Sequence, residues 1–197
     1  MHRDRVVWLD LARIFITGVV LGLVIGKLIV RRPYYLKRLY PKSWLSAAKK
    51  TRVRDWLKLS IVTGYFALLA FFLILDITIV IPAGWLYSQE EYIFTRIAEI
   101  SLPLLFITVT VLPIFEEWIF RGILLEEIAR RTRSRFTGLI TSALIFAVFH
   151  LSNPGMYPAS VIPMTVGGLI LGMCYLLGGL ASAIACHSLY NALLILV

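Results

Sequence analysis

The chain has 197 residues, of which 59% are hydrophobic and only 16% are charged, and its mean hydropathy is +0.85. A soluble domain is about 45–50% apolar and about 25% charged, so this composition excludes a soluble enzyme, a disordered chain and a disulfide-held secreted module. The net charge of +9 would suggest a nucleic-acid partner in a soluble chain, but here the basic residues gather between apolar stretches, and we expect no nucleic-acid binding.

The apolar stretches predict an all-α, polytopic membrane bundle in one domain, residues 1–197. A helix of about 20 apolar residues crosses the bilayer, and the chain holds enough such sequence for about six spans plus one surface helix. The predicted helices are 6–30, 56–82, 97–131, 135–151, 159–177 and 180–197, and the amphipathic segment 43–56 is predicted to lie on the membrane surface. Turn residues at 82–84, 152–155 and 178–179 separate the later helices.

The basic residues predict the orientation. The loop Arg31–Lys58 holds ten Lys or Arg and one acid, Asp55. Short basic loops mark the cytoplasmic side and lie against anionic lipid. Alternation of the helices then puts Ser88–Glu91 outside and the arginines of 130–135 inside. We therefore expect a multi-pass protein of the cell membrane, with this loop in the cytoplasm and anionic lipid as its partner.

Three of the apolar helices carry polar side chains that a lipid-facing helix would not. They are Glu116, Glu117, Arg121, His150, His187 and Asn191. Residues four apart share one face of a helix, so Glu117 lies beside Arg121 and His187 beside Asn191. Insertion of one charged residue at a helix centre costs about 2.5–3.5 kcal/mol. Arg121 can neutralise Glu117, which leaves Glu116 for proton chemistry.

These polar groups are predicted to meet at one depth. Glu116 and His150 each lie fifteen residues from the basic hairpin at 131–135, which is about 22 Å at the helical rise of 1.5 Å per residue. His187 lies eight residues after Gly179, about 12 Å along its helix. The three helices can therefore bring their polar groups to one buried site.

The motifs Glu-Glu-x-x-x-Arg, Phe-x-x-x-His and His-x-x-x-Asn, in this order, resemble the signature of the CPBP (CAAX protease and bacteriocin-processing) family. This family includes the type II CAAX prenyl endopeptidases. The resemblance runs from about Pro113 to Val197 and includes the Phe-Arg-Gly after the glutamates. It implies a catalytic core at about 97–197, to which 1–96 adds the N-terminal helices and the basic loop.

The resemblance implies a glutamate-dependent intramembrane endopeptidase that needs no cofactor or metal. Glu116 would be the base that activates water, and His150 would hold the same water. His187 and Asn191 would donate hydrogen bonds to the oxyanion, and the remaining acid–base pair would support the site. The implied substrate is a peptide or a lipidated protein, with a prenylated CAAX-like C-terminus as one candidate.

Two other functions stay open. A proton-coupled transporter could use Glu116, His150 and Asp76 as relay groups. A catalytically silent scaffold or immunity-type membrane protein could keep the motifs for folding. The sequence has no HExxH motif, which leaves a zinc protease of that kind unsupported, although two histidines and two glutamates could hold a metal in principle.

Overall fold

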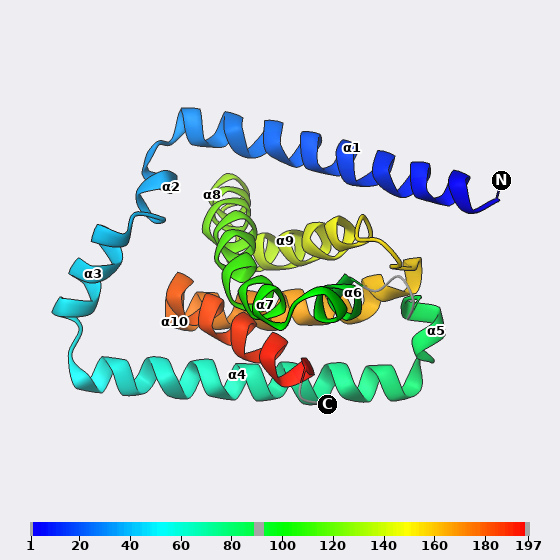
Figure 1. Cartoon of the computed structure of the whole chain (residues 1–197). Helices are drawn as coiled ribbons and strands as arrows, with labels where there is room; N and C mark the ends of the chain where they lie inside the picture. The colour runs from blue at the N-terminus through cyan, green and yellow to red at the C-terminus, as the bar shows by residue number, and fades with distance from the viewer. Residues whose placement is uncertain (1, 89–92, 196–197) are drawn as a thin grey trace.

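A computed structural model describes residues 2–88 and 93–195 as helices joined by short turns (Figure 1). In chain order the elements are α1 His2–Arg31, α2 Tyr34–Lys37, α3 Pro41–Lys50, α4 Val53–Val80, α5 Ala83–Leu86, α6 Ile93–Ile100, α7 Leu102–Glu117, the π-helix η1 Trp118–Leu125, α8 Glu126–Thr132, α9 Arg135–His150, the 3-10 helix η2 Pro158–Ser160, and α10 Val161–Ile195. Within the described part of the chain, extended pairing is limited to one bridge, Tyr87 with Met156. The predicted all-α class is confirmed.

Four helical segments among the described residues are long and apolar enough to cross a membrane. They are Leu11–Arg31, Val53–Val80, Leu102–Thr132 and Pro158–Ile195. Helix α9 is also apolar but has only 16 residues. The last two predicted helices, 159–177 and 180–197, correspond to the two halves of α10, which the non-helical Gly179 separates.

Helix α10 doubles back at Gly179, which has φ +75° and ψ −172°. Glycine adopts a positive φ without the steric penalty of a Cβ atom. In a straight helix, eight residues span about 12 Å, yet the Cys174 Sγ atom lies 3.3 Å from the Ser182 Oγ atom. The predicted turn at 178–179 thus sends the second half of α10 back alongside the bundle, as Figure 1 shows.

The predicted helix 97–131 is divided at Ser101. This residue is extended, and its side chain accepts a hydrogen bond from the Leu104 amide at 3.4 Å. Serine is a favoured N-cap and proline is favoured in a first helical turn, so Ser101 and Pro103 start the new helix α7. The prediction of one uninterrupted helix here was wrong, because a cap and a proline outweighed the apolar periodicity.

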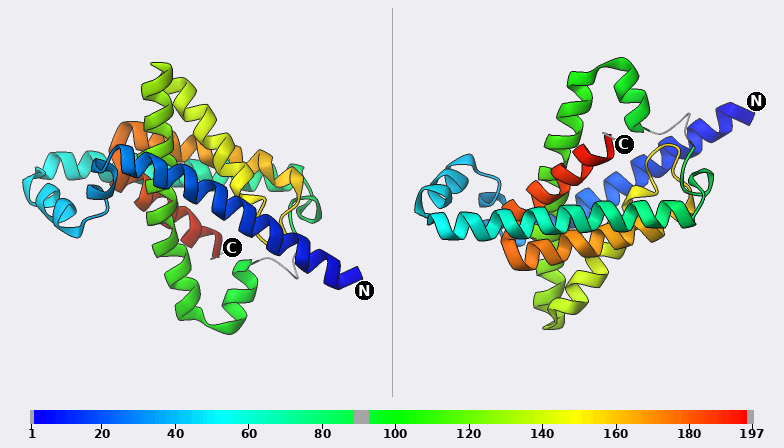
Figure 2. Two further views of the ribbon diagram at one scale, coloured as in Figure 1. Left: turned by 90° about the horizontal axis from the view of Figure 1, so that it is seen from above. Right: turned by 90° about the horizontal axis from the view of Figure 1, so that it is seen from below.

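The helix formed by α7, η1 and α8 crosses the direction of α1 and α4 in both views of Figure 2. Helix α10 packs against α4, α9 and α7. Close approach depends on small residues: a Cβ atom at Gly168 would lie 3.1 Å from the Ala143 Cα atom. The buried core includes Phe66, Ala67, Ala70, Trp118, Phe120, Ile123, Phe146, Ile170, Leu171, Cys174 and Cys186.

The basic residues gather at one end of the bundle, called the basic end below. It holds the loop 31–58 and the hairpin between α8 and α9. Arg32 forms an ion pair with Glu127 at 3.4 Å, and Arg38 forms one with Glu126 at 2.8 Å. In Figure 1 the loop 31–58 lies on the left, where α2 and α3 connect the end of α1 to the start of α4. Two ion pairs therefore connect the loop to α8, and the orientation of the chain stays a prediction.

The opposite end, called the far end, joins α5 to the turn before η2. The Tyr157 amide donates to the Leu86 carbonyl at 3.0 Å, and the Ser88 amide donates to the Gly155 carbonyl at 2.8 Å. Ser88 is thus at the far end, and its predicted extracytoplasmic side stays a prediction. Residues 89–91 of the predicted loop 88–91 lie outside the described residues.

The short helix α2 and the residue after it, Arg38, form hydrogen bonds with the π-helix η1. The Trp118 Nε1 group donates to the Tyr35 carbonyl at 2.9 Å, and Arg38 donates to the Gly122 carbonyl at 3.1 Å. Single π-helical turns inside α-helices are rare, and those that occur often lie at functional sites. The N-terminal half of the chain therefore contacts the Trp118 side chain and the Gly122 carbonyl in the segment that follows the two glutamates.

Replacing Gly138 by alanine should destabilise the protein. A Cβ atom there would lie 2.7 Å from the Leu125 carbonyl oxygen and 2.9 Å from the Ala129 Cβ atom, so α8 and α9 would have to separate. Overpacking of this kind costs about 1–3 kcal/mol. Gly64→Ala is the matched control, because a Cβ at Gly64 has nothing within 4 Å. The Tm of each variant in detergent measures the effect, and equal Tm values for the two variants would contradict it.

Candidate active site

The predicted polar residues converge on a cavity of about 280 Å³ between α4, α7, α9 and α10. Its apolar wall includes Ala70, Ile74, Leu112 and Leu171. The polar side chains that line it are Thr108, Glu116, His150, Asn153, His187, Tyr190 and Asn191. Four of the six residues selected from the sequence therefore face one space. The other two, Glu117 and Arg121, are fully buried behind it.

The Glu116 carboxylate faces two imidazole rings. Its Oε1 atom lies 4.0 Å from His150 Nε2, and its Oε2 atom lies 3.7 Å from His187 Nε2. The Glu116 side chain is 24% exposed, against 13% and 7% for the two histidines. These separations exceed a direct hydrogen bond and suit a small hydrogen-bonding group placed between the carboxylate and the rings.

The backbone fixes the tautomer of His150. Its Nδ1 atom lies 2.8 Å from the Phe146 carbonyl oxygen. A carbonyl only accepts hydrogen bonds, so Nδ1 carries the proton and Nε2 of the neutral ring presents a lone pair to the cavity. The Phe146 ring lies against the imidazole with the centroids 4.2 Å apart. His150 is therefore held as a hydrogen-bond acceptor directed at Glu116.

A buried ion pair holds His187. Its Nδ1 atom lies 2.8 Å from Glu117 Oε1, and the same oxygen accepts from Arg121 at 2.6 Å. Arg121 also donates to the Gly168 carbonyl at 2.9 Å, and its guanidinium lies 4.5 Å from the Phe146 ring centroid. The predicted pairing of Glu117 with Arg121 is observed. It also connects α7, η1, α9 and α10.

The structure adds polar residues that the sequence argument did not select. Asn191 lies one turn beyond His187, as predicted, but Asn153 and Tyr190 also line the cavity. The sequence analysis used Asn153 only as part of a helix-ending turn. Its position three residues after His150, directly past the end of α9, was a usable signal.

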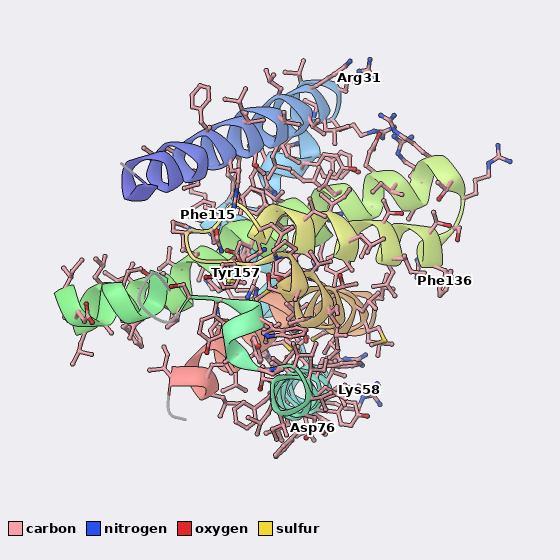
Figure 3. All side chains as sticks on the ribbon, turned by 90° about the vertical axis from the view of Figure 1, so that its right-hand side faces the viewer. Arg31, Lys58, Asp76, Phe115, Phe136 and Tyr157 are labelled. Atoms are coloured by element: carbon pink, nitrogen blue, oxygen red, sulfur yellow. The ribbon has the colours of Figure 1, made fainter. Side chains whose placement is uncertain are left out.

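Asp76 does not join the site. Its side chain is exposed and lies on the outer side of α4 in Figure 3, whereas Ala70 and Ile74 of the same helix line the cavity. The relay of Glu116, His150 and Asp76 suggested for a transporter is therefore not assembled.

The described residues contain no arranged set of metal ligands. No group of three or more His, Cys, Asp or Glu side chains there is placed to hold a metal ion. Addition and removal of metal remain part of the functional test below.

Replacing Arg121 by methionine should strongly destabilise the protein, because it leaves the Glu117 carboxylate buried without its cation. Breaking a buried ion pair from one side costs about 3–5 kcal/mol. The double variant Glu117→Gln/Arg121→Met removes both charges and should recover part of that loss. Thermal unfolding in detergent compares the two, and a double variant no more stable than the single variant would count against this account.

Comparison with known protein families gives one match, over the segment that carries the site. The family model for Rce1-like proteins, described as type II CAAX prenyl endopeptidase Rce1-like, matches residues 98–193. No curated protein and no solved structure gives a significant match. The matched segment contains both glutamates, both histidines and Asn191. It confirms the resemblance drawn from the motifs: the site-bearing segment of this integral membrane protein is similar to the Rce1-like family of proteases.

Proposed function

We propose that this chain is an intramembrane endopeptidase that hydrolyses a peptide bond in a membrane-associated substrate with water activated by Glu116. The observation that carries the proposal is the arrangement of Glu116 between the Nε2 atoms of His150 and His187, at 4.0 and 3.7 Å. Three acceptor groups around one small space suit a water molecule, which has two hydrogens to donate.

Water held in this way is ready to react. It donates one hydrogen to Glu116 and one to the Nε2 lone pair of His150, and its own lone pairs stay free to attack a carbonyl carbon. As the C–O bond forms, Glu116 takes the proton. It later returns a proton to the leaving amine when the C–N bond breaks. A base placed within reach of its proton contributes about 10²–10⁴-fold to the rate.

The oxyanion needs donors on the other side of the carbonyl. The Asn191 amide donates in every state of the site. With its Nδ1 atom donating to Glu117, the neutral His187 ring presents only a lone pair at Nε2. His187 therefore donates to the oxyanion only after its ring takes up a second proton. The Glu117–Arg121 pair acts by positioning His187.

The alternatives receive less support from this geometry. A transport relay needs a path of titratable groups, and Asp76 lies outside the cavity. A silent scaffold would keep the same arrangement without activity, so an assay of cleavage separates it from an enzyme.

Cleavage should depend on Glu116. Purified chain in detergent is incubated with a quenched prenylated CAAX peptide and with the same peptide lacking the lipid, each with and without chelator. Glu116→Ala and Glu116→Gln should lose at least about 10²-fold in rate, and chelator should have no effect. Asp76→Asn, on the outer side of α4, should keep full activity.

The outcomes separate the candidate functions. Equal rates for Glu116→Ala and the unaltered chain would remove the assigned base. Loss of activity with chelator, restored by added zinc, would replace water activation by Glu116 with metal chemistry. Proton flux in liposomes without proteolysis would favour a transporter. A rate advantage of the prenylated peptide would assign the lipid to the substrate.

Asn191→Ala should lower kcat by about 10²–10³-fold with little change in KM, because an oxyanion donor acts mainly in the transition state. Ser188→Ala is the matched control on the same turn, since Ser188 does not line the cavity and donates to the Thr110 carbonyl at 3.4 Å. Steady-state kinetics measure both variants. A rise in KM alone would instead place Asn191 in ground-state binding.

A further inference from the structure

The carboxylate of Glu127 holds three arginines at the basic end. Arg130 contacts both of its oxygens, with Nε at 3.2 Å and Nη2 at 2.5 Å. The Nε atom of Arg131 donates to Oε1 at 2.8 Å, and the Nε atom of Arg32 lies 3.4 Å from Oε2. The Tyr35 hydroxyl donates to the same carboxylate at 3.3 Å. Arg32, Arg130 and Arg131 are called the arginine cluster below.

The arginine cluster carries two positive charges that its central carboxylate does not balance. In the neighbouring pair of Glu126 with Arg38 one carboxylate meets one guanidinium, and the same holds for Glu117 with Arg121. Within the described part of the chain, no second carboxylate forms an ion pair with the cluster. Like charges held this close repel one another, and a further anion would reduce the repulsion. The cluster is therefore suited to bind an anion.

The arginines of the cluster reach solvent, whereas the carboxylate at its centre does not. The exposed fractions are 35, 45 and 55% for Arg32, Arg130 and Arg131, against 5% for Glu127. Arg32 and Arg131 each contact the carboxylate through Nε. Their terminal NH2 groups carry four of the five N–H donors of a guanidinium, and no described residue accepts a hydrogen bond from them. Glu127 thus fixes two guanidinium groups whose outer donors stay available.

These donors match a phosphate group. A guanidinium presents its N–H donors in a rigid planar fork, which binds phosphate oxygens two at a time. Basic pockets between membrane helices bind the headgroups of anionic lipids for this reason. Two guanidinium groups fixed on one buried carboxylate therefore provide both the charge and the donor geometry for a phosphate.

The position of the arginine cluster indicates the source of the phosphate. The apolar segment Leu11–Arg31 of α1 is long enough to cross a membrane, and Arg32 is the next residue. Figure 3 labels Arg31 at this end of α1. The end of a membrane span lies at the level of the lipid headgroups. Tyr34, two residues further on, is 40% exposed, and tyrosine is enriched at membrane interfaces. The phosphates nearest to the cluster are thus those of lipid headgroups.

We infer that the arginine cluster binds the phosphate of an anionic lipid headgroup. The phosphate oxygens accept hydrogen bonds from the terminal NH2 groups of Arg32 and Arg131, while Arg130 stays paired with Glu127. A zwitterionic headgroup carries its own cation beside the phosphate, so an anionic lipid balances the surplus charge better. This is a defined site, in contrast to the diffuse attraction expected of the whole loop 31–58. It does not depend on the proposed function.

A phosphate bound at the cluster would connect parts of the chain that have few other connections. The cluster joins the end of α1 to the last turn of α8, and most residues of α1 between 11 and 31 are exposed. Tyr35, which donates to Glu127, also accepts from the Trp118 indole through its carbonyl. Bound lipid should therefore stabilise the fold, including the segment directly after the two glutamates.

Thermal unfolding in a non-ionic detergent tests the site. The Tm is measured against increasing phosphatidylglycerol, phosphatidylcholine or inorganic phosphate at constant ionic strength. Phosphatidylglycerol should raise the Tm to a plateau, and neither of the other two should raise it comparably. The double variant Arg32→Gln/Arg131→Gln keeps the pair of Arg130 with Glu127. It should weaken phosphatidylglycerol binding roughly 30-fold, as expected for two arginines near an anionic surface.

The matched control is Lys49→Gln/Lys50→Gln, which removes the same charge from exposed positions in the last turn of α3. This variant should bind phosphatidylglycerol as the unaltered chain does. Native mass spectrometry counts the lipid molecules that remain bound to each variant. It therefore compares the variants even where the substitutions themselves change the Tm.

Three results would overturn the inference. A Tm that does not rise with phosphatidylglycerol would remove this ligand from the cluster. Equal losses of binding in the arginine and lysine double variants would show diffuse attraction by the basic loop in place of a site. An equal rise with inorganic phosphate would replace the lipid headgroup by a free anion.

Discussion

The buried pair of Glu117 and Arg121 is the interaction on which the rest of the structure depends. In a low-dielectric interior neither charge is tolerable alone, so the carboxylate and the guanidinium must stay together. The pair also reaches the Gly168 carbonyl, the His187 ring and the Phe146 ring. One electrostatic requirement thus sets the relative positions of α7, α9 and both halves of α10, and places Glu116, the residue before Glu117, at their junction.

Much of this arrangement could be predicted from the sequence. Four-residue spacing fixes which side chains share a helix face, and distance from the arginine hairpin fixes their depth. Both depend on regular helical geometry, which apolar sequence in a membrane adopts reliably. The meeting of Glu116, His150 and His187 followed from these two arguments, and the turn at Gly179 followed from the paired glycines 178–179. These predictions succeeded because they needed only local structure and a common reference surface.

The remaining features depend on contacts between elements that periodicity cannot show. The division between α6 and α7 follows from the Ser101 cap, whose strength against an apolar run cannot be judged from periodicity. The role of Nδ1 in His187 became visible only when Glu117 was seen to accept from two partners. Asn153 lines the cavity from the turn after α9, a position that helical periodicity does not cover.

The hydrogen bonds between the α2 region and η1 show that polar groups of the family-matched segment have partners outside that segment. Without residues before 98, the Trp118 indole would lose its acceptor at Tyr35, and the Gly122 carbonyl would lose Arg38. Loss of α4 would also uncover the face of α10 that holds Ile170, Leu171 and Cys174. The part of the chain before residue 98 therefore covers polar groups of η1 and apolar groups of α10, and its removal should expose both.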